Sequence, residues 1–154
     1  MSVNHRAPFI LILILLLAAA LRFINLNQTP PGLWFDEAWV AVQARDLGSE
    51  ALGFPLYFPA DFGGMHPAIV YLTALSNPLF DNHPYAIRYA TAAAALFSLV
   101  LAYIAWKAIW KLAPQTPGGG ITASLFSAFI LAITLPYLIL TRLGFEPVLP
   151  ALPA

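Results

Sequence analysis

Two adjacent carboxylates, Asp36 and Glu37, stand among aromatic side chains in the segment LWFDEAW, residues 33–39. Aromatic side chains of this kind favour the edge of a bilayer, where a charged group is expensive to place and is usually kept for function. A carboxylate held there can act as a general base toward a hydroxyl group. Two structural roles remain open: Asp36 can cap the N-terminus of a short helix, and Glu37 can favour the positive end of the helix dipole.

Further side chains are placed where they could meet a charged or polar substrate. His66 stands directly before an apolar run, so it either caps a helix or meets a phosphate at that helix's free N–H groups. Arg88 lies about one turn inside an apolar block, where an arginine must snorkel or pair with a lipid phosphate or a loop acid. Arg22, at the end of another block, would snorkel. Arg142 and Glu146 would pair on one face if a helix continued through both.

The composition identifies the class of protein. Apolar residues make up 60% of the 154 positions and charged residues only 9%, and the mean hydropathy is +0.78. A soluble domain carries roughly a quarter charged residues, so this surface could not be kept in water. The net charge is zero and there is no basic run, which argues against nucleic acid as a partner. The absence of cysteine excludes disulfides and thiolate metal sites.

Three apolar blocks are each long enough to cross the hydrocarbon as a helix of about 20 residues: residues 8–26, 84–110 and 121–143. The first could instead be a signal peptide cleaved near the small residues 18–20, but its apolar run continues past Arg22. Pro136 lies inside the third block, where a kink is tolerated if neighbours satisfy the carbonyl that it frees. The sequence therefore predicts an all-α membrane protein with three transmembrane helices.

The charges divide between the two sides of these predicted spans. His5 and Arg6 precede the first block, and Lys107 and Lys111 stand at the link of residues 111–120. All seven acidic residues fall instead between the first two blocks or after the third. The positive-inside rule then places the N-terminus and the link in the cytoplasm. We expect an inner (plasma) membrane protein whose loop of residues 27–83 is extracytoplasmic.

This outer loop is far longer than a connector requires, and long loops are usually functional. Helical spacing predicts two short helices in it, at about residues 36–47 and 67–76, lying at the membrane interface. Asp81, Asn82 and His83 would cap the next span. Residues 144–154 would form an outer segment that includes the start of a further span.

An ordered set of short motifs resembles one membrane enzyme family. The set consists of Leu21-Arg22, Pro31-Gly32-Leu33, Asp36-Glu37-Ala38, His66-Pro67 with Tyr71, Ala86-Ile87-Arg88, and Thr141-Arg142-Leu143-Gly144-Phe145-Glu146-Pro147. It is similar to the GT-C membrane glycosyltransferases, in the branch of the protein O-mannosyltransferases and the lipid A aminoarabinose transferases. The resemblance runs from about residue 20 to residue 150.

The resemblance implies sugar transfer from a polyprenyl-phosphate donor to a hydroxyl of a protein, lipid or glycan, with inversion at the anomeric carbon. Asp36 would be the catalytic base, and Glu37 would support it or contact the acceptor. His66, Arg88 and Arg142 would stabilise phosphate charge. Glu146 would be a polar partner near either sugar. No cofactor is expected, no metal-ligating residues are assigned and a divalent metal requirement stays open, while membrane lipid is a partner.

Two features depart from the family pattern. Ala68 stands where the mannosyltransferases have a second proline after His-Pro, and family members are several times longer with many more spans. We therefore expect the N-terminal part of such an enzyme, inactive without a missing C-terminal part. The rivals are a non-catalytic membrane subunit and a transporter or channel fragment. The latter should carry acids inside its spans, and the predicted spans carry none.

Overall fold

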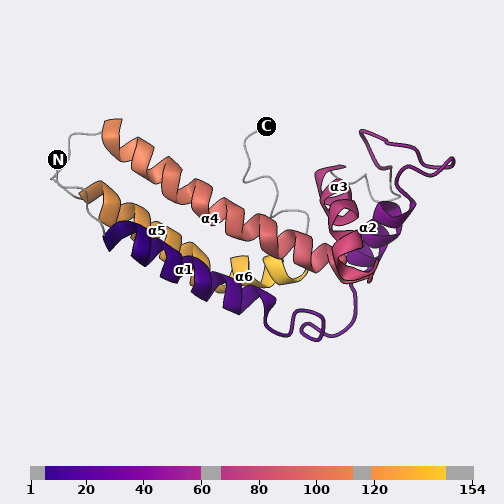
Figure 1. Ribbon diagram of the computed structural model, residues 1–154, viewed down its shortest axis with the longest axis horizontal. Coiled ribbons are helices and arrows are strands. Elements are labelled where there is room, and N and C mark those ends of the chain that lie inside the picture. The colour runs from indigo at the N-terminus through magenta and orange to yellow at the C-terminus, as the bar shows by residue number, and fades with distance from the viewer. Residues whose placement is uncertain (1–5, 60–66, 113–118, 145–154) are drawn as a thin grey trace.

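The computed structural model describes residues 6–59, 67–112 and 119–144, and within these ranges the chain is built from helices (Figure 1). The elements in chain order are α1 (Arg6–Phe23), α2 (Phe35–Asp46), α3 (Pro67–Ser76), the short 3-10 helix η1 (Asn77–Phe80), α4 (Ala86–Leu112), α5 (Gly119–Ile133) and α6 (Leu135–Arg142). The prediction of an all-helical chain is confirmed for this part of the molecule, and α2 and α3 begin within one residue of their predicted starts.

Two helices, α1 and α4, are long and apolar enough to cross a membrane. The third predicted span is divided at Thr134 into α5 and α6, which are bent by 57° relative to one another. The described residues thus contain two candidate spans, or three if the bent pair crosses as one. Helices α1, α4 and α5 run side by side along the molecule (Figure 1).

The core of this bundle is made of small and branched aliphatic side chains. Ala18 of α1, Ala128 and Ala132 of α5, and Leu99 of α4 are fully buried, and Ile14 is nearly so. Small residues let helix backbones approach closely, and close packing is the main attraction between helices in lipid. Most larger side chains of α1, such as Phe9 and Leu16, point outward and are exposed.

The bend between α5 and α6 has an identifiable cause. Pro136 has no N–H, so the carbonyl four residues earlier, that of Ala132, loses its helical donor. Arg22 of α1 replaces it, because its Nη1 donates to the Ala132 carbonyl at 3.0 Å and to the Ala18 carbonyl at 3.3 Å. Its guanidinium also faces the ring of Tyr137, 5.3 Å from the centroid. The expectation that Arg22 snorkels is wrong: it is buried against the broken helix.

Helices α2 and α3 gather at the end of the bundle opposite to the start of α1 and the end of α4 (Figure 1). They enclose a second core of six buried side chains: Val40, Ala44, Phe58, Ile69, Val70 and Ile87. Ile87 belongs to the first turn of α4, so this cap is packed onto the second span. Helices α2 and α3, with the segment around Phe58, are therefore a folded unit that packs on the bundle, and this unit is called the cap.

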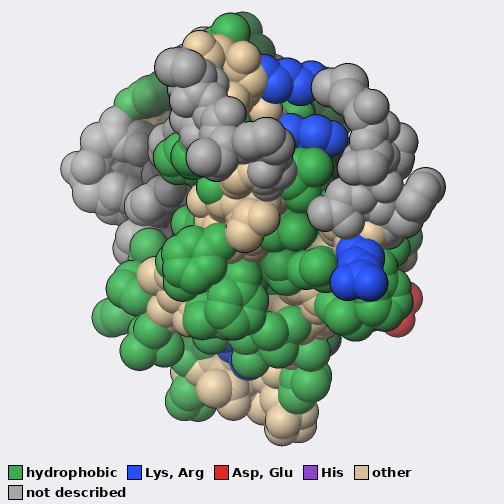
Figure 2. Space-filling view, turned by 90° about the vertical axis from the view of Figure 1, so that its left-hand side faces the viewer, with side chains coloured by type: hydrophobic (Ala, Val, Ile, Leu, Met, Phe, Trp, Pro, Cys, Tyr) green, Lys and Arg blue, Asp and Glu red, His purple; other side chains and the backbone are tan. Residues whose placement is uncertain are grey.

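Basic residues lie at the other end of the bundle. Arg6 begins α1, while Lys107 and Lys111 lie in the last two turns of α4. Figure 2 looks onto this end and shows separate Lys and Arg side chains on a largely hydrophobic described surface. The described acidic residues all belong to the segment between α1 and α4. The described acidic residues thus lie at the end opposite to Arg6, Lys107 and Lys111, while Arg22, Arg45, Arg88 and Arg142 lie at the acidic end.

Candidate functional site

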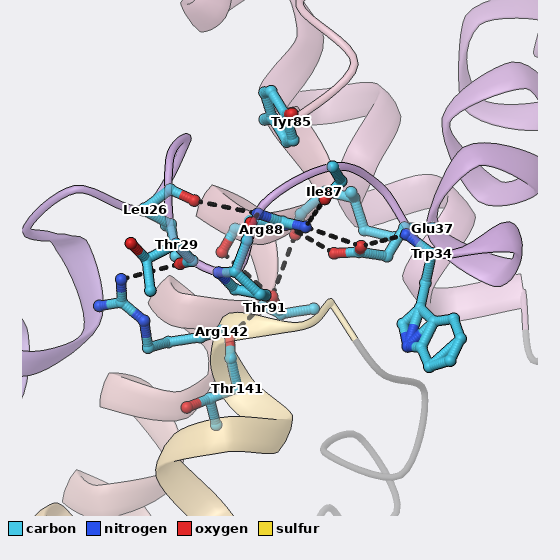
Figure 3. A network of polar contacts seen from close by, with 12 residues as sticks. Leu26, Thr29, Trp34, Glu37, Tyr85, Ile87, Arg88, Thr91, Thr141 and Arg142 are labelled. Atoms are coloured by element: carbon cyan, nitrogen blue, oxygen red, sulfur yellow. Dashed lines mark hydrogen bonds and ion pairs between the residues drawn. The ribbon is translucent and has the colours of Figure 1, made fainter.

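A buried ion pair joins the cap to helix α4. Glu37 lies in the first turn of α2 and Arg88 in the first turn of α4, and both side chains are 0% exposed. The Arg88 Nε and Nη2 atoms donate to Glu37 Oε1 and Oε2 at 2.7 and 2.9 Å (Figure 3). This two-bond geometry is the strongest form of an Arg–carboxylate contact. The prediction that Arg88 pairs with a loop acid is confirmed.

Every N–H donor of Arg88 has a partner. Beyond its two bonds to Glu37, Nη1 donates to the carbonyls of Leu26 and Pro30 at 3.3 and 2.7 Å, and Nη2 donates to the carbonyl of Gly32. A guanidinium carries five such donors, so none is left for a ligand. Arg88 therefore fixes the chain path between α1 and α2.

Both carboxylate oxygens of Glu37 are likewise bound by other groups of the protein. Its Oε2 also accepts the backbone N–H of Trp34 at 2.8 Å. Trp34 is the N-cap of α2, with extended backbone angles, so Glu37 occupies the third helical position. A glutamate there that binds the N-cap N–H is half of a capping box. The interpretation of Asp36 as the N-cap is wrong, because Trp34 holds that position.

The end of α6 completes the site from a third direction. Gly144 has a φ of +59°, and a Cβ added to it would lie 3.2 Å from Glu37 Oε1 and 3.0 Å from Ile87 Cγ1. The hydroxyl of Thr91 in α4 lies 3.1 Å from the carbonyl of Thr141 in α6. A side chain at position 144 would press directly on the ion pair.

Arg142 ties the same end of α6 to the end of α1. Its Nη1 donates to the Leu21 carbonyl at 2.7 Å, and its Nη2 donates to the Ile24 carbonyl at 3.0 Å. Nη2 also donates to the Thr29 carbonyl at 2.9 Å (Figure 3). Helix α6 ends at Arg142, and the chain turns through Gly144. The condition for an Arg142–Glu146 pair, a helix that continues through both residues, is therefore not met.

A hollow of about 430 Å³ opens beside the ion pair. It is lined by Pro30, Pro31, Gly32, Leu33, Trp34, Glu37, Arg88 and Leu143. Because Glu37 and Arg88 neutralise one another, its wall carries no net charge from these two groups. It is large enough for a small ligand, in the range of typical binding sites.

Asp36 is placed differently from its neighbour. It lies in the first turn of α2 and is half-buried, and it does not line this hollow. Within the described ranges, its carboxylate makes no hydrogen bond or ion pair. Of the two adjacent acids, Glu37 binds Arg88 and the Trp34 backbone, whereas Asp36 binds no described group.

Two of the predicted site residues, His66 and Glu146, fall outside the described residues. The site residues that the sequence analysis did not assign are Gly144 and Thr91, whose roles depend on contacts across the fold. In the described ranges, no group of three His, Asp or Glu side chains could hold a metal ion.

The comparisons with known proteins add no neighbour: no protein-family model, curated protein or solved structure matches this chain significantly.

Proposed function

We propose that this chain is the N-terminal part of an inverting glycosyltransferase that uses a polyprenyl-phosphate sugar on the extracytoplasmic face of the membrane. Asp36 is the general base. It takes the proton of an acceptor hydroxyl while that oxygen bonds to the anomeric carbon and the lipid phosphate leaves with its bonding electrons. The acceptor is a protein, lipid or glycan.

The observation that carries this proposal is the different environment of the two adjacent acids. A general base needs a carboxylate whose lone pairs are free for the substrate. The oxygens of Glu37 are already filled by Arg88 and Trp34. Asp36, on the same helical turn, has no such partner among the described residues. The structure thus supplies a firmly anchored turn with one uncommitted carboxylate, which favours Asp36 as the reacting group.

The contacts of the arginines refine their proposed roles. Arg88 is a positioning residue, because its five donors are taken by protein acceptors. Arg142 is half-buried and uses only its two terminal nitrogens within the described ranges. Its Nε is left to face the phosphate of the donor. His66 keeps its proposed role as a second phosphate contact, and Glu146 its role near the sugar.

The test compares carboxamide variants in membranes that carry the complete enzyme, with a radiolabelled polyprenyl-phosphate sugar as donor. Asp36→Asn removes the base and should lower transfer by about 10²- to 10⁴-fold while the protein stays folded. Asp46→Asn, at the other end of the same helix, is the matched control and should retain wild-type transfer. Wild-type transfer by a folded Asp36→Asn enzyme rules out the proposed reaction.

A non-catalytic membrane subunit is the second candidate. The observation in its favour is the apolar exterior of the outer cap, where Trp34, Phe54 and Leu56 are 59%, 72% and 87% exposed. Exposed apolar groups of this kind mark surfaces that contact lipid or another protein. A subunit of this type should tolerate Asp36→Asn but lose assembly when these three side chains are made polar.

A further inference from the structure

A second hollow lies on another face of α2. Its volume is about 210 Å³, and it is lined by Leu33, Ala38, Ala41, Val42, Arg45, Asn77, Asn82, His83 and Pro84. Leu33 lies between the two hollows, because it lines both. Asp36, Glu37 and Arg88 do not line this one. The proposed transfer reaction therefore gives it no role.

One wall carries a buried amide that has no partner. Asn77, at the start of η1, is only 8% exposed. Its side chain makes no hydrogen bond to any part of the chain that the structure describes. Three described side-chain atoms are fully buried without a hydrogen-bond partner: Arg22 Nε, Thr73 Oγ1 and Trp110 Nε1. The amide atoms of Asn77 are not among them. The amide of Asn77 can therefore be reached from the hollow. Because buried amides are normally hydrogen-bonded, its partner has to be a molecule in the hollow.

Two neighbours add donors and acceptors at the rim. His83 accepts the N–H of Tyr85 at its Nδ1, at 3.3 Å, so the Nε2 of the neutral ring carries the proton and is a donor. Asn82 is exposed and offers a second amide. Asn77, Asn82 and His83 together offer both hydrogen-bond donors and acceptors to a ligand.

The charge of this hollow is balanced. Arg45 is the one arginine that lines it, no lysine does, and the Arg45 Nε donates to Asp46 Oδ1 at 2.9 Å. That hydrogen bond lowers the pKa of the Asp46 carboxyl, so the carboxylate stays ionised and neutralises the guanidinium at neutral pH. An anion would have to compete with this carboxylate. The balance favours a neutral ligand.

The opposite wall is apolar and formed by one face of α2. Ala38, Ala41 and Val42 lie at helical spacing, and Leu33 and Pro84 close the sides. The volume corresponds to about seven water molecules at roughly 30 Å³ each, which is the size of one sugar ring. A pyranose presents hydroxyls along its rim and C–H groups on its faces, and this matches amides on one wall and methyl groups on the other.

We propose that this hollow binds one neutral pyranose unit, held by the Asn77 amide and packed against the apolar face of α2. The site does not depend on glycosyl transfer, because it shares none of the proposed catalytic residues. A sugar held here would lie on the far side of Leu33 from the Glu37–Arg88 pair.

The test is saturation-transfer difference NMR on the 154-residue chain in nanodiscs made from lipids without sugar headgroups. The probes are the methyl glycosides of glucose, galactose and mannose, each measured separately. At least one should receive saturation at its ring protons. Asn77→Leu removes the amide with little change in volume and should weaken binding about fivefold to tenfold, the loss expected for one hydrogen bond. Ala41→Phe fills the hollow and should abolish the signal.

The controls separate the ligand classes from a folding defect. Asn27→Leu, at an exposed amide outside the hollow, should bind like the wild type, and the unfolding midpoint of each variant verifies the fold. Saturation transfer that is equal in the wild type and in folded Ala41→Phe overturns the proposal, as does the absence of transfer to all three glycosides. Displacement of the glycoside by inorganic phosphate would identify an anion site and would also overturn it.

Discussion

Arg22 donates a hydrogen bond to the backbone carbonyl of Ala132 across 110 positions of sequence. That carbonyl is the one deprived of its helical donor by Pro136. A charged side chain of α1 thereby bonds to a backbone carbonyl of α5 at the break before α6. The pair explains how a chain with a proline inside an apolar helix keeps its backbone groups satisfied at membrane depth.

This relationship predicts a coupling between two distant substitutions. Arg22→Met should leave the Ala132 carbonyl without a donor and lower the free energy of unfolding by about 1–3 kcal/mol. In a Pro136→Ala background the helix can donate its own N–H, so the same substitution should cost less. The measurement is a double-mutant cycle by chemical unfolding in micelles. Strictly additive costs would contradict the proposed replacement of the missing donor.

The two adjacent acids should differ sharply in their effect on stability. Glu37→Gln leaves the buried Arg88 without its counter-charge and should lower the free energy of unfolding by about 3–5 kcal/mol. Asp36→Asn, on the same turn, should stay within about 0.5 kcal/mol of the wild type, because this carboxylate has no described partner to lose. Unfolding curves of the two variants under identical conditions make the comparison. Equal destabilisation would show that Asp36 is also part of the structural network.

Gly144 should be more sensitive than another glycine with the same backbone angle. Gly144→Ala combines a strained φ of +59° with a Cβ pressed against Ile87 and Glu37. Gly53→Ala is the matched control, because its φ is +62° and nothing lies within 4 Å of the added Cβ. Both substitutions should lower the free energy of unfolding by about 1–2 kcal/mol because of the left-handed backbone, and only Gly144→Ala should lower it further. Thermal unfolding in micelles measures the difference, and equal losses would remove Gly144 from the site.

The topology can be tested directly because the chain has no cysteine of its own. Glu50→Cys, exposed in the outer loop, should react with a membrane-impermeant maleimide added to intact cells. Lys111→Cys, exposed at the end of α4, should react only after the cells are permeabilised. The reverse pattern would place the loop in the cytoplasm and exclude the extracytoplasmic reaction proposed for Asp36.

The sequence predicted the elements better than it predicted their partners. Hydropathy predicted the long apolar helices α1 and α4, because this signal is local, but it did not predict the bend between α5 and α6. The N-cap of α2 was missed because the Trp34 side chain makes no capping hydrogen bond, whereas residue preference at this position favours an acid such as Asp36. The burial of Arg22 could not be read from its neighbours, because its main acceptor belongs to α5. The same holds for Gly144, whose constraint comes from Ile87 and Glu37.

The saturation of Arg88 also has a consequence for the order in which the molecule assembles. The carbonyls of Leu26, Pro30 and Gly32 and the carboxylate of Glu37 leave the ribosome 51 to 62 residues before the guanidinium that will bind them. Until α4 is made, these four acceptors lack the guanidinium that fixes the chain path between α1 and α2. The segment between α1 and α2 should therefore reach its final path only after α4 has formed, so a ribosome stalled before residue 88 would expose an unfinished loop to proteases.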